Sequence, residues 1–190
     1  PNWKCGQETS IRTINLIISI ELLGHENISK NCIKLLRFHL ERINLTVFYA
    51  KAQNNNHIIS ESTALYLVGY FLWINTQEKK YYKIYIKASK LIENSLKKLV
   101  MDDGTFAQYS TVYHRMVLDL CSVLELLRSR WGNKPFSDIF YKKIKLALEW
   151  YASMIDPVSG GMPNMGGNDG TYLFNFDHKL YRDFRPSLSL

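Results

Sequence analysis

The chain has 190 residues, an apolar content of 46% and a formal net charge of +7 at pH 7. These values are typical of one globular domain and exclude a disordered chain. The basic balance suits an anionic partner, either nucleic acid, a membrane surface or an acidic polysaccharide, although a solvated basic surface explains it equally well. No apolar run is long enough to cross a bilayer and no signal peptide opens the chain, so we expect no membrane insertion.

The cysteines, Cys5, Cys32 and Cys121, are odd in number and widely spaced, without a CxxC or Cys/His metal spacing. A disulfide scaffold and a zinc site are therefore disfavoured, and Cys32 and Cys121 are predicted to be small core residues. We expect neither a metal nor another cofactor.

Six helices are predicted in chain order, at about 6–23, 29–50, 58–73, 79–100, 110–130 and 137–155. Gly24 suits the left-handed position after the first helix, and Asn27 or Ser29 is expected to cap the second. The first, third and fifth helices are apolar on nearly all sides, which predicts burial all round. The second, fourth and sixth have one apolar face, and their opposite face carries most of the lysines, including Lys142, Lys143 and Lys145.

This alternation of buried and amphipathic helices in three hairpins predicts an all-α fold. The pattern leaves open whether the helices close into an α/α toroid or form an open solenoid. We expect a single domain over 1–190, with the hairpins in about 1–155 and a Gly-rich loop and the start of a further element in 156–190. Lysines on the outer faces favour a solvated surface, and no nucleic-acid-binding motif is present, so we expect no nucleic-acid partner.

The Gly-rich loop covers residues 156–170, and the aromatic, charged segment Tyr172–Pro186 follows it. Loops of this length are usually functional or disordered. No Lys-Ser/Thr pair follows the glycines, so the loop is not a P-loop.

Hairpin topology predicts that the inner helices run in the same direction and open on one rim. Their N-termini carry Glu8 with Arg12, the run from Asn54 to His57, and the run from Tyr109 to Arg115. Amides, histidines, a tyrosine, a carboxylate and an arginine would then meet at one mouth, where backbone N–H groups favour an anion.

Each of these residues also has a structural interpretation. Asn56 could cap the third helix, and His57 or His114 could be a structural histidine. Tyr113 could be a core aromatic, and Glu8 could pair with Arg12 on one helix face. In the same way, Asp102 and Asp103 could be turn residues before Gly104. The hypothesis of a site therefore depends on their convergence.

The motifs Asn55-Asn56-His57, Asp103-Gly104-Thr105-Phe106 and Tyr113-His114, in that order, resemble the heparinase II/III-like family of polysaccharide lyases. The opening Trp3–Arg12 is similar to the first toroid helix of that family. The stretches Pro163–Gly170 and Asp183–Pro186 resemble members found with bacterial surface-polysaccharide genes. The similarity covers nearly the whole chain.

The resemblance implies an incomplete α/α toroid that is joined to a C-terminal β-sandwich in full-length relatives. It implies β-elimination at a uronic acid of an acidic polysaccharide. Asn56 and His57 would stabilise the enolate-like intermediate, and Tyr113 would protonate the O4 leaving group and could also act as the base. The expected substrate contacts are Glu8, Arg12, Asn55, His114, Asn168 and Asp169.

The chain begins without Met and stops before the β-sandwich, so we expect a fragment of a longer enzyme, with weak or no activity alone. For the full-length protein we expect the bacterial periplasm or cell envelope. One alternative is an α/α-toroid glycoside hydrolase that uses carboxylates such as Glu8, Asp102 or Asp169. A second is a non-catalytic helical scaffold that binds a polysaccharide or a peptide.

Overall fold

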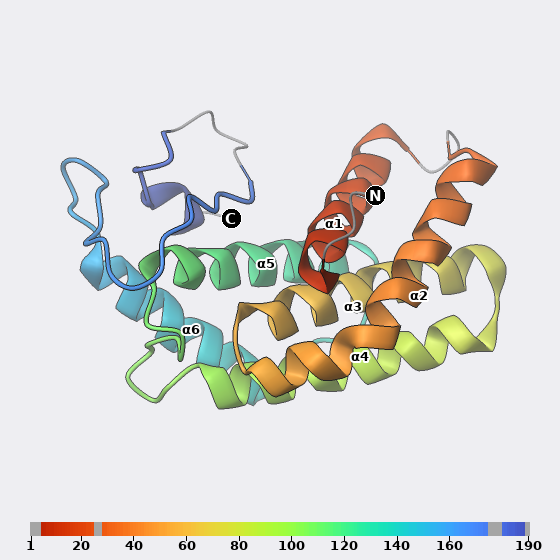
Figure 1. Ribbon diagram of the computed structural model, residues 1–190, viewed down its shortest axis with the longest axis horizontal. Coiled ribbons are helices and arrows are strands. Elements are labelled where there is room, and N and C mark those ends of the chain that lie inside the picture. Colours follow the sequence, from red (N-terminus) through yellow and green to blue (C-terminus); the bar gives the residue numbers. More distant parts are fainter. Residues whose placement is uncertain (1–4, 25–27, 175–179, 189–190) are drawn as a thin grey trace. The chain divides into compact units, whose positions relative to one another are not determined.

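The computed structural model describes residues 5–24, 28–174 and 180–188. Over these residues the chain is all-α, as predicted, and the only β pairing is an isolated bridge between Val100 and Phe106. Trp3, Asn27 and residues 175–179 of the aromatic segment, which entered the predictions above, lie outside the described residues. The helices are α1 (Gly6–Leu23), α2 (Lys30–Gln53), α3 (Asn56–Thr76), α4 (Lys79–Leu99), α5 (Thr111–Arg130), α6 (Asp138–Met154) and the 3-10 helix η2 (Arg185–Leu188) (Figure 1).

Serine caps set the starts of two helices. The Ser29 hydroxyl accepts a hydrogen bond from the backbone N–H of Cys32 at 3.1 Å, at the start of α2. The Ser110 hydroxyl accepts one from the N–H of Tyr113 at 3.2 Å, at the start of α5. Each cap contributes about 1 kcal/mol to stability. Because such caps are local signals, these boundaries were predictable from sequence.

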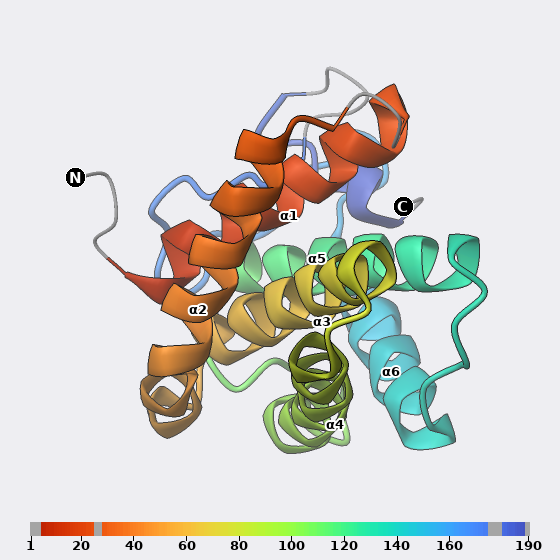
Figure 2. The same cartoon turned by 90° about the vertical axis from the view of Figure 1, so that its right-hand side faces the viewer.

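The chain divides into two compact units, residues 1–92 and 93–190, and α4 continues from the first into the second. The first unit is built around α3, which packs against both α1 and α2 (Figure 2). Residues 58–69 of α3 are all buried, as its apolar composition predicted. Each large apolar side chain fully buried there contributes about 1.5–3 kcal/mol.

The prediction that α1 is buried on all sides is wrong. Leu22 and Leu23, near its end, are 78% and 73% exposed. The buried face of α1 includes Thr9 and Thr13 among its isoleucines. The Thr13 hydroxyl donates to the carbonyl of Thr9 at 2.8 Å, so this buried polar group is satisfied within the helix. Part of the buried face of α1 is therefore formed by small hydroxyl side chains, where the sequence pattern had predicted large apolar ones.

Within the first unit, a glycine allows α4 to approach α3 closely. A Cβ atom at Gly69 would lie 3.1 Å from the backbone nitrogen of Tyr85. Around this contact the ring centroids of Tyr66 and Tyr85 are 4.8 Å apart, and those of Trp73 and Tyr82 are also 4.8 Å apart. Tilted aromatic pairs at such distances add to the energy of burial.

The second unit is built on the hairpin of α5 and α6, which are joined by residues 131–137 (Figure 2). Along α5 most residues are buried, as the sequence predicted, and they include the free thiol Cys121, which is 2% exposed. Burial raises the pKa of Cys121. The other two free cysteines, Cys5 and Cys32, are half-buried.

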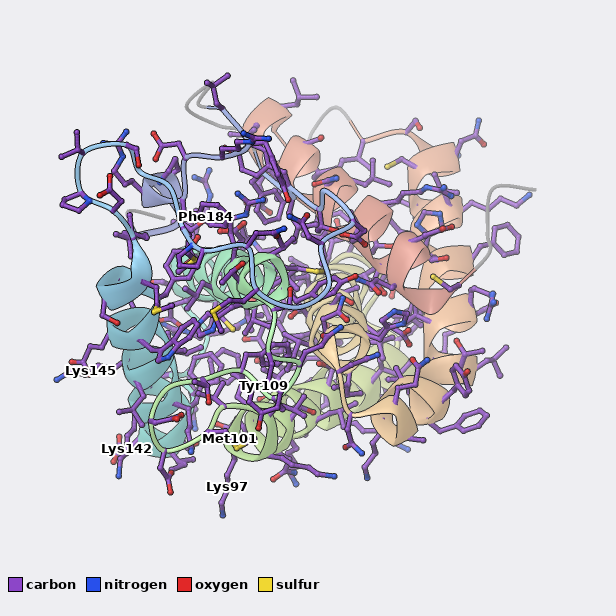
Figure 3. All side chains as sticks on the ribbon, turned by 60° about the vertical axis from the view of Figure 1, so that its left-hand side comes forward. Lys97, Met101, Tyr109, Lys142, Lys145 and Phe184 are labelled. Atoms are coloured by element: carbon purple, nitrogen blue, oxygen red, sulfur yellow. The ribbon has the colours of Figure 1, made fainter. Side chains whose placement is uncertain are left out.

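Lys143 was expected on the outer face of α6 and is instead 6% exposed. Its Nζ donates to the carbonyl of Val100 at 2.7 Å and to Oδ1 of Asp102 at 2.9 Å. Figure 3 shows its neighbours Lys142 and Lys145 pointing outward from α6. A long side chain whose charge is paired can be buried at a position that periodicity assigns to solvent.

The turn after α4 is held by its two aspartates in different ways. Asp102 pairs with Lys143, while Oδ1 of Asp103 accepts hydrogen bonds from the N–H and the hydroxyl of Thr105 at 2.9 and 2.7 Å. Gly104 has a φ of 88°, and a Cβ there would lie 2.2 Å from the carbonyl oxygen of Leu146. Both aspartates therefore have structural contacts in this turn.

Candidate functional site

In the first unit, the asparagine run joins α2 to α3 almost directly. Asn54 ends α2 in the left-handed conformation, with φ 49° and ψ 50°. Asn55 is the N-cap of α3, and its Oδ1 accepts a hydrogen bond from the backbone N–H of His57 at 3.0 Å. This cap explains why α3 begins at Asn56 rather than at Ile58 and shows that Asn55, not Asn56, has the capping role.

Asn56 is only 2% exposed, whereas His57 is half-buried. The Ser60 hydroxyl lies 3.3 Å from the Asn56 carbonyl and 3.0 Å from the His57 carbonyl, which fixes the first turn. Burial lowers the pKa of His57 below its ordinary value of 6.5. The imidazole is therefore neutral at neutral pH, so one ring nitrogen can donate a hydrogen bond and the other can accept one.

Glu61, one turn after His57, is a candidate that the sequence reasoning left out. It is 3% exposed, and its Oε2 has no hydrogen-bond partner among the described residues. Burial raises the pKa of Glu61 to about 7, although the charge of Arg42 acts in the opposite direction. Perturbed carboxyl groups of this kind are concentrated at functional sites. The signal in the sequence was a single carboxyl group in a helix without any Lys, Arg or other acidic residue.

The start of α1 lies against this carboxyl group. A Cβ atom at Gly6 would be 2.4 Å from Oε1 of Glu61, so a larger residue there would require the Glu61 carboxyl group to move. Within the first unit, the first turn of α1 and the second turn of α3 are thus neighbours. The predicted substrate contacts Glu8 and Arg12 are both exposed on α1.

In the second unit, the first turn of α5 is bound to the Gly-rich loop. The Ser110 hydroxyl, which caps α5, also donates to the carbonyl of Gly167 at 2.6 Å. The Tyr113 hydroxyl donates to Oδ2 of Asp169 at 2.9 Å. Two of the predicted site residues, Tyr113 and Asp169, are therefore in direct contact.

The electrostatics of this pair favour a protonated tyrosine. Partial burial and the Asp169 carboxylate both raise the pKa of Tyr113. Partial burial also raises the pKa of Asp169, but hydrogen bonds from Thr171 and Tyr113 outweigh it and leave that pKa below its ordinary value. At neutral pH the pair therefore consists of a protonated phenol and a carboxylate, and a tyrosinate base is disfavoured.

His114, predicted to contact substrate, lies in the core with 1% of its surface exposed. Its Nε2 is 2.9 Å from the carbonyl oxygen of Ala147, and its ring stacks on Trp150 and Tyr151. Burial lowers the pKa of His114 to about 4. In this structure His114 is a packing residue, as its structural interpretation proposed.

Arg115 was not selected as a site residue, yet it holds the end of the chain in place. It is 1% exposed, and its guanidinium donates to the carbonyls of Tyr181 and Thr171 at 2.8 and 2.7 Å. The same guanidinium lies 4.6–4.8 Å from the ring centroids of Tyr172, Tyr181 and Phe184. Figure 3 shows Phe184 beside α5. Contacts of a cation with desolvated aromatic faces are among the stronger cation–π interactions.

Asn168 forms one wall of a pocket in the same unit. Its amide nitrogen donates to Oδ1 of Asn164 at 2.7 Å, and its Oδ1 accepts from the Tyr181 hydroxyl at 2.5 Å. The pocket has a volume of about 410 Å³. Its described lining consists of Gly161, Met162, Asn164, Asn168, Tyr181, Arg182 and Phe184.

The sequence predicts that Asn56, His57 and Tyr113 lie together at one mouth. Asn56 and His57 belong to the first unit and Tyr113 belongs to the second, so their proximity stays a prediction.

Among the described residues, no group of three or more His, Cys, Asp or Glu side chains is arranged to hold a metal ion. No helix in that part of the chain has the length and apolar character needed to cross a membrane. Comparison with protein-family models, curated proteins and solved structures finds no match to this chain.

Proposed function

We propose that this chain is the helical part of a polysaccharide lyase that cleaves a uronic-acid-containing polysaccharide by β-elimination. The observation that carries the proposal is the hydrogen bond from Tyr113 to Asp169, which supplies a protonated phenol at the start of a buried helix. The motif resemblance to heparinase II/III-like lyases supports the reaction class, and it assigns the proton donor to the same tyrosine.

The helical architecture is compatible with the toroid that this function implies. α3 and α5 are buried along most of their length, whereas α2, α4 and α6 each bury one face. We infer that these helices belong to an incomplete α/α toroid, in which hairpins repeat around a central mouth.

β-Elimination removes the proton on C5 of the uronate and expels the oxygen on C4. The leaving oxygen must receive a proton, and a tyrosine whose pKa is raised by burial and by Asp169 retains its proton at neutral pH. The Asp169 carboxylate keeps Tyr113 protonated before the reaction, so we assign Tyr113 the role of general acid for the O4 oxygen. The C5 proton passes to a separate base, for which we propose the second histidine that the resemblance assigns to the β-sandwich, and transfer of that proton to the tyrosinate after the elimination restores Tyr113.

The electrons left by the C5 proton pass to the uronate carboxyl group, where hydrogen-bond donors stabilise the developing charge. His57, half-buried and neutral at neutral pH, is the donor that we assign to this position. Asn56 is 2% exposed and would reach the substrate only after a local rearrangement. Both residues stay in the proposal because they follow the cap that fixes the first turn of α3.

The test is incubation with polymers of glucuronate, galacturonate and mannuronate, followed by measurement of unsaturated uronate and of reducing ends. It is carried out on the complete gene product and on the 190-residue chain. We expect unsaturated product from the complete protein and little or none from the chain alone, because the resemblance assigns a second histidine to the β-sandwich. Reducing ends without unsaturated product would replace the lyase with a hydrolase, and binding without either product would indicate a non-catalytic scaffold.

Tyr113→Phe is the decisive variant. It should reduce turnover by at least about 100-fold, which is the usual contribution of general acid catalysis, while polysaccharide binding persists. Tyr109→Phe is the matched control, because Tyr109 is exposed just before α5 (Figure 3). Full turnover in the Tyr113 variant would disprove its role.

A further inference from the structure

The pocket beside Asn168 has the size and composition of a ligand site. Its volume of about 410 Å³ lies in the small part of the range of roughly 300–1,000 Å³ that is typical of small-molecule sites. Two aromatic residues, Tyr181 and Phe184, and Met162 form its apolar surface, while two asparagines and an arginine supply polar groups. This mixture suits a short segment of a saccharide chain, which has apolar C–H faces and a rim of hydroxyl groups.

The polar groups of the pocket are mainly hydrogen-bond donors. A primary amide carries two N–H donors, and the described contacts use one at Asn168 and neither at Asn164. Oδ1 of Asn168 is occupied by the Tyr181 hydroxyl and by the N–H of Gly170 at 3.0 Å. The two amides therefore offer a ligand more N–H donors than acceptor oxygens. A ligand that matches them should be rich in oxygen atoms that accept hydrogen bonds.

The described lining of the pocket carries a positive charge. Arg182 is the one formally charged residue in its described lining, and its side chain is exposed. The nearby carboxylates have partners of their own: Asp183 forms two hydrogen bonds with Arg185, at 2.9 and 2.7 Å, and Asp169 accepts from Tyr113 and Thr171. A guanidinium with five donors matches a carboxylate in charge and in geometry.

Two residues of the lining, Tyr181 and Phe184, are held in place by Arg115. The Arg115 guanidinium lies 4.8 and 4.6 Å from their ring centroids and donates to the Tyr181 carbonyl at 2.8 Å. Side chains held in this way lose little conformational entropy on binding. The pocket also adjoins the proposed acid, because Asn168 directly precedes the Asp169 that accepts from Tyr113.

We infer that the pocket formed by Asn164, Asn168, Tyr181 and Arg182 is a subsite for an anionic saccharide unit, with Arg182 binding its carboxylate and the amides binding its hydroxyl groups. This inference deepens the proposed function and rests on it for the identity of the ligand as a uronate. It makes a separate claim about binding, which can be measured without turnover.

The experiment is a titration of the 190-residue chain, observed through backbone amide resonances in two-dimensional NMR. The probes are tetrasaccharides of glucuronate, galacturonate and mannuronate, each compared with the neutral tetrasaccharide that has the same linkage and a hydroxymethyl group at C6. We expect at least one acidic probe to shift the amides of Gly161 and Asn168, and its neutral counterpart to bind roughly tenfold more weakly or worse, the usual value of a hydrogen bond to a charged group.

Arg182→Gln should weaken binding of the acidic probe by a similar factor and leave binding of the neutral probe unchanged. Lys145→Gln is the control, because it removes one positive charge from the outer side of α6 (Figure 3). Equal loss in both variants would mean that general electrostatics, and not the pocket, attracts the probe, and would overturn the inference. Equal binding of acidic and neutral probes, or no shift with any probe, would also overturn it.

The outcomes separate this inference from the lyase proposal. Shifts in the pocket without unsaturated product from the complete protein would support the subsite and disprove the lyase. Unsaturated product together with an unresponsive pocket would support the lyase and disprove the subsite.

Discussion

The hydroxyl of Tyr113 donates a 2.9 Å hydrogen bond to the carboxylate of Asp169, a residue 56 positions later in the chain. This bond connects the first turn of α5 to the Gly-rich loop and places a carboxylate beside the phenol. A carboxylate next to a phenol stabilises the protonated phenol. The pair therefore keeps Tyr113 protonated at neutral pH.

Asp169→Asn should lower the pKa of Tyr113, because it removes the negative charge and leaves burial as the main remaining cause of the raised value. The measurement is a pH titration of the tyrosine Cζ resonances by carbon NMR, with Tyr113→Phe used to assign the signal. Asp103→Asn, which changes an aspartate bonded to Thr105 in another turn, is the control. An unchanged Tyr113 titration in the Asp169 variant would contradict the described pair.

Glu61 should make the first unit less stable as pH rises from about 4.5 to about 7. In the unfolded chain its carboxyl group ionises near 4.5, whereas burial raises the pKa of Glu61 in the folded state to about 7. The folded state therefore holds the proton over this window, so stability is fully present below 4.5 and is lost as pH rises through 7.

The loss amounts to at most about 3 kcal/mol in the free energy of unfolding. Denaturant unfolding at a series of pH values should show this loss as a difference between the parent chain and Glu61→Gln, because other buried groups such as Asp119 and His114 titrate in both proteins. Glu41→Gln, on the exposed side of α2, should keep it. Identical pH profiles for the parent chain and Glu61→Gln would refute the assignment.

Gly104→Ala should destabilise the second unit by about 3 kcal/mol. The substitution forces a side chain into a positive-φ conformation and brings its Cβ to 2.2 Å from the Leu146 carbonyl oxygen. Gly132→Ala is a matched control, because Gly132 has a φ of 66° but nothing within 4 Å of an added Cβ.

Gly132→Ala should lower the free energy of unfolding by only about 1–2 kcal/mol, which is the cost of placing a side chain at a positive φ. The free energy of unfolding of both variants, from urea denaturation, tests the difference. Equal losses would mean that the close approach of Gly104 to α6 does not contribute.

Arg115→Lys should loosen the C-terminal part of the second unit. Lysine keeps the charge but loses the planar group that bonds two carbonyls and lies against three aromatic rings. We expect a loss of about 2–4 kcal/mol and faster amide hydrogen exchange in residues 171–174 and 180–184. Arg130→Lys, at the exposed end of α5, should leave that exchange unchanged.

The helix boundaries were largely predictable because the signals that set them are local. Ser29 and Ser110 lie within three residues of the N–H groups that they cap, so their roles can be read from neighbouring residues. The asparagine run was harder, because Asn54 and Asn55 end one helix and begin the next. In such a run any of the three asparagines could have been the cap.

Burial of polar residues was not predictable in the same way. Lys143 bonds to Val100, 43 residues earlier, and His114 contacts Ala147, 33 residues later. A period of 3.6 residues describes the helix that carries a side chain and contains no information about the partner on another helix. For the same reason, the motifs selected Tyr113 and Asp169 as separate candidates, but the sequence did not predict the contact between them.

The unequal burial of the three cysteines gives the chain an intrinsic probe of its own fluctuations. A thiol reagent added to the native protein should modify Cys5 and Cys32 first, because both are half-buried, while Cys121 is 2% exposed inside α5. Modification of Cys121 would then require transient opening of the helical hairpin. The rate of its labelling would measure the free energy of that opening without any engineered reporter.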